Sequence, residues 1–414
     1  MRQRVLVGRL CLWLCTLCLS GIAWAGDAEV VPKGVFKIDV ESKFYFPATQ
    51  RFNPDGKLED VAIDFNTSLD NNVFPGLRQL ESAFELPAGV ASIGDSIVAF
   101  QLEFIDLLMS LQYGVTDRLT VGVIVPYYWQ TSKVSARLDT SRATVGKNTA
   151  LNALVPLSIP GTTPLTAEDV QGLLGKGLDI NGDGTVDLPG FGFKRFETWS
   201  DNGVGDFETG FRYQYLKTRH WRLALTSGVR FPTGRVDDPD NLVDTALGMG
   251  AYALPFRLNT DFTGIANVVL HTTLSYDLYL PDRQTRRVPD NVNQPITRNR
   301  EEVKRDLGDI VRVEVSGRYT LLQGLSLSGL YEFGAKWKDR VSGKKGFAYT
   351  SLEEETNWTS HIFIVEIFYT TVPLYLAKRF PVPLVASLAY RDRFAGSNNA
   401  LDTQFISLRV QAFF

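Results

Sequence analysis

Apolar and polar residues alternate along most of this 414-residue chain. The pattern is clearest at the end, where Ile406, Leu408, Val410, Ala412 and Phe414 are interleaved with polar residues. A period of two gives a β-strand one apolar and one polar face. A last strand that closes on an aromatic residue is typical of outer-membrane β-barrels, where it pairs with the first strand. We therefore expect this strand to close a barrel and to be recognised by the barrel-assembly machinery.

The same alternation predicts twelve strands. They are expected at 35–46, in a hairpin over 98–130, in a second hairpin over 204–234, and at 246–257, 265–280, 309–320, 325–338, 357–369, 383–394 and 404–414. An even number returns both ends of the chain to the periplasmic side, as a closed bacterial barrel requires. The segment 246–257 differs from the others because it is rich in Gly and Ala.

The connections between these strands alternate in length. Short or moderate turns at 114–118, 217–221, 321–324 and 370–382 alternate with long connections at 47–97, 131–203, 281–306 and 339–356. Short periplasmic turns and long external loops are the asymmetry expected of such barrels. The predicted fold class is therefore all-β: a transmembrane antiparallel β-barrel of about 12 strands over residues 26–414, with long extracellular loops. The mildly amphipathic stretch 74–86 leaves open whether the first long loop folds inward as a plug.

The polar faces of the strands carry many charges. A large soluble β-protein would have to bury them against a dry core, which is costly, whereas a water-filled lumen accommodates them. Their mixed sign predicts weak ion selectivity. The residues predicted to line the lumen are Lys37, Asp39, Glu41, Lys43, Glu103, Asp206, Glu208, Arg212, Arg230, His271, Arg312, Glu314, Arg318, Glu332 and Arg409.

The first 25 residues have the organisation of a signal peptide. Arg2, Arg4 and Arg9 precede or flank a short apolar stretch, and Ala23-Trp24-Ala25 is a small-x-small cleavage site. The expected division is therefore a signal peptide at 1–25 and a mature barrel at 26–414, located in the outer membrane of a Gram-negative bacterium. Beyond residue 26, no run of 18 apolar residues occurs that could form a membrane-spanning helix.

Composition narrows the chemistry of the mature chain. All three cysteines lie within the signal peptide, which excludes disulfides and thiolate sites. Without the three leader arginines, 43 basic residues become 40 against 46 acidic ones, a net charge of −6. This acidity argues against nucleic acid as a partner. The expected partners are membrane lipid and small-molecule solutes.

One motif in the second long loop suggests a metal ion. Asp179, Asn181, Asp183, Thr185 and Asp187 supply oxygen ligands at the spacing of the first nine positions of a calcium loop. Position 12 is a glycine rather than the bidentate glutamate of an EF-hand, which predicts weak binding of Ca²⁺. The alternative is an ordinary polar turn, because Asn, Asp and Gly dominate turns.

A helix is predicted just before this motif. Thr166 can cap residues 167–174, with Asp169 three positions later completing a capping box.

Histidines are the main argument for an enzyme. Of the three, His271 shares a strand face with Thr273, Ser275 and Asp277, which suggests a catalytic triad. Alternate residues on a strand are about 7 Å apart, however, while a nucleophile and its base must lie within about 3 Å. A polar lumen accounts for these residues, and we expect no enzymatic activity; an outer-membrane hydrolase is the less favoured alternative.

Three stretches resemble a known family. Residues 113–127 (Tyr-Gly-Val-Thr-Asp-Arg-Leu-Thr-Val-Gly-Val-Ile-Val-Pro-Tyr), 203–213 (Gly-Val-Gly-Asp-Phe-Glu-Thr-Gly-Phe-Arg-Tyr) and 225–234, with its Arg-Phe-Pro-Thr-Gly end, are similar to outer-membrane transporters, or porins, associated with the meta-cleavage pathway of phenol degradation. The resemblance implies passive or facilitated uptake of small, often hydrophobic or aromatic molecules. A closed structural or adhesive barrel without transport is the alternative.

Overall fold

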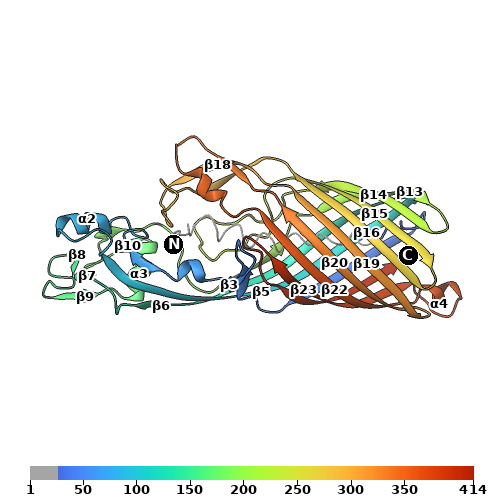
Figure 1. The fold of residues 1–414 in the computed structure, drawn as a ribbon, viewed down its shortest axis with the longest axis horizontal. Helices are drawn as coiled ribbons and strands as arrows, with labels where there is room; N and C mark the ends of the chain where they lie inside the picture. The colour runs from blue at the N-terminus through green and yellow to red at the C-terminus, as the bar shows by residue number, and fades with distance from the viewer. Residues whose placement is uncertain (1–26) are drawn as a thin grey trace.

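The chain folds into a long, closed β-barrel with a large assembly at one end (Figure 1). The computed structural model describes residues 27–414, so the predicted signal peptide lies outside the described residues. The barrel strands are β1 (Phe36–Tyr45), β5 (Ser92–Thr116), β6 (Leu119–Asp139), β13 (Glu208–Lys217), β14 (Trp221–Arg230), β15 (Ala253–Ile265), β16 (Val268–Tyr279), β19 (Ile310–Leu322), β20 (Leu325–Lys336), β22 (Trp358–Thr370), β23 (Leu384–Gly396) and β24 (Gln404–Phe413).

Every barrel strand is antiparallel to its two neighbours, and the last strand closes the ring on the first. β1 pairs with β24 from Lys37 opposite Phe413 to Tyr45 opposite Phe405. At the very end, Phe36 and Phe414 exchange two backbone hydrogen bonds of 2.9 Å. The prediction of a twelve-stranded barrel closed by the C-terminal strand is confirmed.

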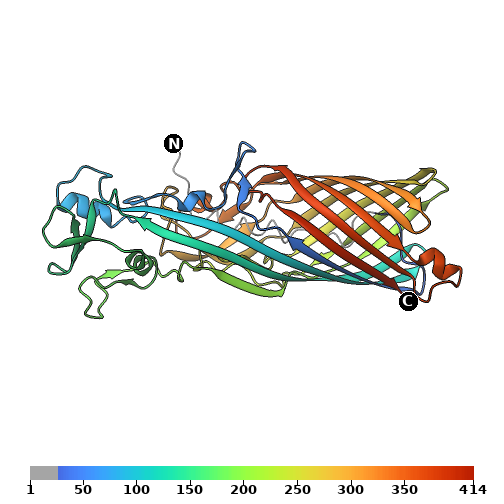
Figure 2. The ribbon, with the colours of Figure 1, turned by 90° about the horizontal axis from the view of Figure 1, so that it is seen from below.

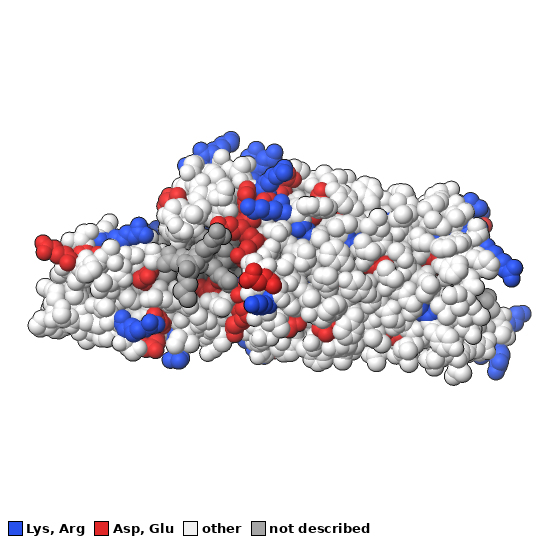
Figure 3. All heavy atoms as spheres, viewed as in Figure 1, with Lys and Arg blue, Asp and Glu red and all other residues white. Residues whose placement is uncertain are grey.

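The outer surface of the barrel is an apolar belt. On β16, for example, Leu270 and Leu274 face outward and are exposed, while His271, Thr273 and Asp277 face inward and are buried. Figure 3 shows this belt as a mostly white zone between charged residues at the two ends of the molecule. Apolar side chains outside and polar ones inside are the arrangement expected of a barrel surrounded by lipid.

The two ends of the barrel differ. The short turns and the C-terminus lie at one end, and the long connections lie at the other (Figure 1). Further elements at that outer end are β2 (Gln50–Phe52), β3 (Leu58–Asp60), η2 (Ile63–Phe65), β4 (Ser68–Asp70), α2 (Leu77–Ala83), β7 (Val145–Asn148), β8 (Ala153–Pro156), β9 (Thr162–Pro164), α3 (Ala167–Leu174), β10 (Gly177–Leu178), β11 (Leu188–Pro189), β12 (Trp199–Val204), β17 (Asp282–Arg287), β18 (Arg300–Asp306), β21 (Arg340–Ser342) and η3 (Tyr349–Leu352). A short helix, α4 (Val372–Leu376), lies in a turn at the opposite end. No helix in the described range 27–414 is long and apolar enough to cross a membrane.

The hairpin of β5 and β6 is longer than the sequence pattern predicted. It starts at Ser92 rather than at 98, ends at Asp139 rather than at 130, and projects beyond the barrel wall (Figure 2). Its projecting part carries an apolar core that includes Phe65 of η2, Phe100 of β5 and Phe196. The rings of Phe65 and Phe100 pack edge to face, with centroids 5.0 Å apart.

This outer core also decides where the first long loop folds. Leu77 and Leu80 of α2 are buried in it together with Phe74, and α2 lies at the far outer end of the molecule (Figure 2). The inward plug left open for residues 74–86 is therefore wrong. Their apolar side chains pack in the outer core beside the projecting hairpin, away from the lumen.

The strand predicted at 246–257 is displaced. β15 starts at Ala253 and runs to Ile265, whereas the Gly- and Ala-rich residues before it form a buried loop. Gly250 adopts a φ of +74°, which favours glycine and interrupts the extended backbone. The predicted start of this strand, residue 246, is therefore wrong: the strand begins seven residues later, at Ala253.

The helix predicted at 167–174 is confirmed as α3. Thr166 caps it by accepting a hydrogen bond from the Asp169 N–H, and the Asp169 carboxylate accepts one from the Thr166 N–H, completing the capping box. Lys147 of β7 donates to the same carboxylate over 2.8 Å. Burial by itself raises the pKa of Asp169, but these hydrogen bonds from Lys147 and Thr166 hold it below its usual value.

We predict that Asp169→Asn destabilises α3 relative to the wild type, and that this difference depends on pH. Because the pKa of Asp169 is lower in the folded state, its contribution is present above about pH 4 and is lost as the pH falls through the folded-state pKa. At pH 7 the variant should lose about 1 kcal/mol of local stability. Hydrogen exchange of the α3 amides, corrected for intrinsic rates, should differ between variant and wild type at pH 7, and the difference should shrink as the pH is lowered below about 4. A difference that stays constant over this range would contradict the prediction.

Candidate functional site in the barrel lumen

Most of the charges predicted for the lumen do lie on the inward face of the barrel. Asp39, Lys43, Glu208, Arg212, Arg230, His271, Glu314 and Glu332 are buried there, and Lys37, Glu41, Arg312, Arg318 and Arg409 are partly buried. Several are arranged in ion pairs that cross from strand to strand. Pairing of this kind offsets the cost of removing charges from bulk water.

One such network spans five consecutive strands, β13 to β16 and β19. Glu208 accepts from Arg230 over 2.9 Å and from Arg257 over 3.1 Å. Asp277 in turn pairs with Arg312 at 3.1 Å and with Arg230 at 3.6 Å. Two carboxylates thus hold three guanidinium groups against one side of the lumen.

A second group covers the seam where the barrel closes. Asp39 of β1 accepts from Nε of Arg409 over 2.8 Å and from the Gln411 amide over 2.9 Å, both on β24. Lys37 lies 3.9 Å from the same carboxylate, and Lys43 lies 4.0 Å from Glu41. The first and last strands are therefore joined by side chains as well as by backbone.

Glu103 does not line the lumen. It is on the outward face of β5, where its carboxylate pairs with Lys133 of β6, while Phe100, Leu102 and Phe104 face inward. The reason is the position of Glu103 along the hairpin, beyond the part that forms the barrel wall. β1 pairs with β5 only as far as Ile105, so Glu103 lies in the projecting part of the hairpin, whose apolar face packs on the outer core.

Residues 231–252, between β14 and β15, fold over part of the outer mouth of the barrel. Asp206 holds this segment by accepting from the N–H of Gly234 and of Met249, over 2.9 and 2.8 Å. Met249 packs among inward-facing residues at the outer ends of the strands, including Tyr279, Ile310 and Trp358. Arg235 bridges Asp201 of β12 and Asp244 of the segment itself. This segment therefore packs against inward-facing residues on several strands at the outer mouth.

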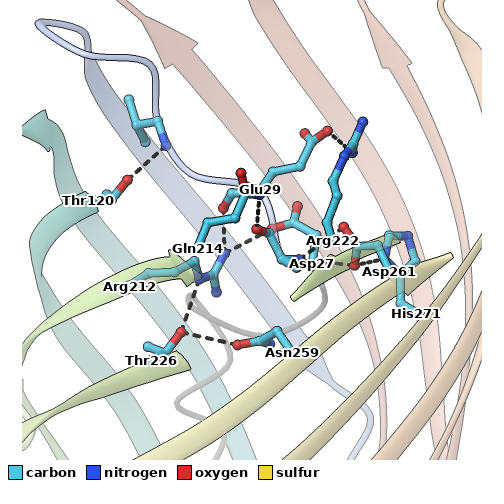
Figure 4. A network of polar contacts seen from close by, with 12 residues as sticks. Asp27, Glu29, Thr120, Arg212, Gln214, Arg222, Thr226, Asn259, Asp261 and His271 are labelled. Carbon is cyan, nitrogen blue, oxygen red and sulfur yellow. Dashed lines mark hydrogen bonds and ion pairs between the residues drawn. The ribbon is translucent and has the colours of Figure 1, made fainter. Parts of the chain in front are cut away.

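The periplasmic end of the lumen is crossed by the residues that precede β1 (Figure 4). Sequence reasoning missed this feature because the segment has no periodicity. The segment from Asp27 to Val35 leaves β1 and contacts β6, β13, β14 and β15, and β15 is the fifth strand around the ring from β1. It therefore spans from one wall almost to the opposite one.

Arg212 and Asp261 are the principal anchors of this segment. Arg212 donates to the Asp27 carboxylate over 2.9 Å and to the Glu29 carbonyl over 3.2 Å. Asp261 accepts from the Ala28 N–H with both oxygens, at 3.0 and 3.1 Å, and Ala28 is 0% exposed. At these two anchors the segment is therefore held by charge-assisted hydrogen bonds.

Further contacts hold both flanks of the crossing segment. Gln214 donates to the Ala28 carbonyl over 2.7 Å, Thr120 accepts from the Val31 N–H over 2.8 Å, and Arg222 pairs with Glu29.

Gly114 of β5 permits the close approach of this segment. A Cβ on Gly114 would lie 2.0 Å from the Pro32 carbonyl oxygen and 2.5 Å from that of Val31, well inside contact distance. Gly114 and the segment also exchange backbone hydrogen bonds, since the Gly34 N–H donates to Gly114 and the Gly114 N–H donates to Val35. A signal for this contact was present in the Tyr-Gly-Val-Thr-Asp-Arg motif, where the glycine has a packing role.

The arrangement around His271 is structural. Its Nδ1 lies 2.8 Å from Asp261, the carboxylate that also holds Ala28. Thr273 accepts from Asn259, and Asp277 belongs to the arginine network described above. His271 is thus hydrogen-bonded to Asp261 on the neighbouring strand, whereas Thr273 and Asp277 of its own strand face have other partners.

The other two histidines lie apart from this group. His220 is exposed in a turn at the periplasmic end, and His361 is hydrogen-bonded to the Tyr331 hydroxyl.

The predicted calcium loop lies between β10 and β11 at the outer end. Asp179 accepts from the N–H groups of Gly182 and Gly184, and Asp183 accepts from that of Thr185. Asn181 accepts from the Asp183 N–H, and Asp187 accepts from that of Ile180. Within residues 27–414, no three His, Cys, Asp or Glu side chains are placed together to hold a metal ion. Binding of Ca²⁺ stays a prediction from the motif.

The calcium prediction is tested by calorimetry on the folded protein in detergent. We expect a dissociation constant of ~10⁻⁴ to 10⁻³ M, abolished by Asp183→Ala, because the loop lacks the twelfth-position ligand. Asp117→Ala, in a periplasmic turn, is the matched control and should leave the titration unchanged. Absence of calcium heat in the wild type, or its survival in Asp183→Ala, would refute the prediction.

Comparison with known proteins supports the fold. No protein-family model matches the chain, and no curated protein matches it in sequence. The structure is similar to the crystal structure of an outer-membrane channel from Pseudomonas putida F1, with a TM-score of 0.53 and 13% identity over 94% of this chain and 99% of that one.

Two other solved barrels align more loosely. A toluene transporter of Ralstonia pickettii gives a TM-score of 0.35 with 10% identity, over 97% of this chain and 94% of that one. A FadL homologue of Pseudomonas aeruginosa gives 0.32 with 10% identity, over 92% and 90%. These two scores are too low to carry an argument. The Pseudomonas putida channel, by contrast, matches over nearly the full length of both chains, and the fold is that of an outer-membrane β-barrel.

Proposed function

We propose that this protein is a channel in the outer membrane of a Gram-negative bacterium, through which small solutes enter by passive or facilitated diffusion. The observation that carries this proposal is the two-sided wall. Lipid surrounds the apolar belt, while two groups of paired charges face the interior. A barrel with no transport role has no need for a charged interior, because apolar side chains can fill it without the cost of burying ion pairs.

Small hydrophobic or aromatic molecules are the solutes we propose. The resemblance of residues 113–127, 203–213 and 225–234 to transporters of the phenol-degradation pathway is the basis for this finer assignment. Aromatic rings also occur among the luminal cations: the Arg318 guanidinium lies 4.4 Å from the Phe368 ring centroid, and that of Arg391 lies 5.2 Å from Phe405. Such an arginine can exchange its cation–π contact with a ring of the protein for one with the ring of an aromatic solute.

The segment from Asp27 to Val35 would act as the gate. It spans the periplasmic end of the lumen, and the contacts that hold it are a few polar anchors, chiefly on β13 and β15. These anchors are buried, but each hydrogen bond contributes only about 1 kcal/mol net when water can replace it as the segment leaves. The segment can therefore leave the lumen while the twelve strands stay paired.

We predict that removing the segment opens the barrel. A variant that lacks residues 28–33 but keeps the leader should show a larger single-channel conductance in planar bilayers than the wild type. It should also show faster swelling of liposomes in small sugars or phenols. The physical reason is the loss of the backbone that crosses the lumen between Gly114 and Asp261.

Two point variants separate a gate from a general effect on luminal charge. Arg212→Gln removes an anchor of the segment, while Arg409→Gln removes a luminal arginine that contacts Asp39 instead. Only Arg212→Gln should raise the open probability of the channel in planar bilayers. Equal, low conductance of the wild type and the deletion variant would support the closed structural or adhesive barrel and refute the channel.

The proposed surroundings follow from the same architecture. Outer-membrane lipid covers the belt, and β24 carries the terminal signal for the barrel-assembly machinery. Esterase activity lost in His271→Ala would favour the hydrolase alternative.

A further inference from the structure

A small sheet stands on the outer edge of the apolar belt and is not part of the barrel wall. It consists of β17, β18 and β21, which extend from the outer ends of β16, β19 and β20. Figure 1 shows β18 protruding from the side of the molecule at the level where the barrel strands end. No part of the proposed transport route uses this sheet.

The outward side of this sheet and its adjoining turn is strongly basic. Lys and Arg gather over β18 in Figure 3, just beyond the white belt. The exposed cations are Arg283, Arg300, Lys304, Arg340, Lys344 and Lys345. Across the whole sequence, acidic residues outnumber basic ones by three. The cations are therefore concentrated on this sheet against the overall charge of the chain.

Carboxylates near these cations neutralise only part of the charge. Glu302 is exposed on the sheet and lies 3.7 Å from Arg283, and Asp240 lies 2.5 Å from Arg300. Glu301 is turned inward, where it accepts from the Tyr349 hydroxyl, and Glu353 accepts from the Val341 N–H. Within residues 27–414, the side chains of Lys304, Arg340 and Lys344 have no hydrogen-bond or ion-pair partner. Their charges are left for a ligand outside the chain.

The position of the sheet identifies the region that it faces. Tyr252, Leu280 and Trp337 are exposed at the outer ends of the barrel, Trp337 at 53%, and the Tyr276 ring packs against Trp337. Aromatic residues mark the boundary between hydrocarbon and headgroups. β17 starts at Asp282, two residues beyond Leu280, so the basic sheet lies at the level of the outer-leaflet headgroups.

The sheet is also rigid. Val303, Val288 and Leu352 form a small buried core beneath it. Arg305 fixes β18 to the barrel mouth by pairing with Asp282 and donating to the Met249 carbonyl. A rigid surface loses little conformational entropy when it binds a ligand, which favours recognition of a defined headgroup.

We propose that this basic sheet binds the phosphate groups of lipopolysaccharide, the phosphorylated glycolipid of the outer leaflet. Arginine and lysine are the residues that recognise phosphate, through charge-assisted hydrogen bonds. The sheet and its adjoining turn carry six of them at headgroup level, and Lys304, Arg340 and Lys344 are the ones whose side chains have no hydrogen-bond or ion-pair partner within residues 27–414. They lie directly above the apolar side chains of the belt, which face the acyl chains. One lipid molecule can therefore bind the basic sheet with its phosphates and the apolar belt with its acyl chains.

The test uses the full-length folded protein in detergent, titrated with purified phosphorylated lipopolysaccharide. In the variant Lys304→Gln/Arg340→Gln/Lys344→Gln, the dissociation constant should rise about a hundredfold, because each basic residue near an anionic lipid surface contributes roughly a factor of five. Wild-type binding should weaken on going from low to high salt.

The matched control removes the same charge elsewhere at the outer end. Lys57→Gln/Arg78→Gln/Arg137→Gln alters three exposed basic residues away from the sheet and should bind like the wild type. Chemically dephosphorylated lipopolysaccharide and vesicles of phosphatidylglycerol should bind weakly to the wild type. If the triple variant does not fold, the single Lys304→Gln variant should still weaken binding severalfold.

Three results would overturn the proposal. They are unchanged binding in the sheet variant, equal loss in the control variant, and equal affinity of the wild type for phosphatidylglycerol. The last result would mean non-specific adsorption to any anionic lipid. Because none of these variants touches Asp27 to Val35, channel conductance provides a separate readout, and the two proposals can fail independently.

Discussion

The hydrogen-bonded pairing of β24 with β1 is the constraint on which the rest of this structure depends. In lipid, an unpaired backbone N–H or C=O costs several kcal/mol, so a membrane-spanning sheet must have no free edge. The Phe36–Phe414 and Lys37–Phe413 pairs remove that edge. Once the sheet is closed, alternate side chains on every strand must face either lipid or the lumen, which gives the apolar belt and the charged interior a single cause.

A closed charged interior creates its own requirement, because each luminal charge needs a partner. The strands meet part of this requirement themselves, as with Asp39 and Arg409 across the closing seam. The chain before β1 supplies more partners: its backbone and carboxylates occupy Arg212, Gln214 and Asp261. The polar groups of the lumen thus hold a segment that crosses it. Under the proposed function, opening requires these groups to exchange the segment for water or solute.

The differences between expectation and structure have one origin. The period of a strand shows that its two faces differ, but not whether lipid, the lumen or another part of the chain lies against each face. Glu103 has the alternation of a luminal residue, yet its strand has left the membrane and its apolar neighbours pack on the outer core. The stretch 246–252 has a weak strand pattern, but it is used to cover the barrel mouth. The crossing segment from Asp27 to Val35 carries no pattern at all, since its fold is defined by partners on β5, β6, β13, β14 and β15, which lie 79 or more residues away.

The sequence by itself determined the number of strands, the closing strand, the asymmetry of the loops and the capped helix at 167–174. All of these follow from local rules: a period of two, turn-forming residues, and a capping box within four residues. Only the tertiary structure decided the contents of the lumen, the cover of its outer mouth and the concentration of cations on β17, β18 and β21. Those features depend on side chains brought together from distant strands, and no local pattern encodes which strands will be neighbours across a barrel.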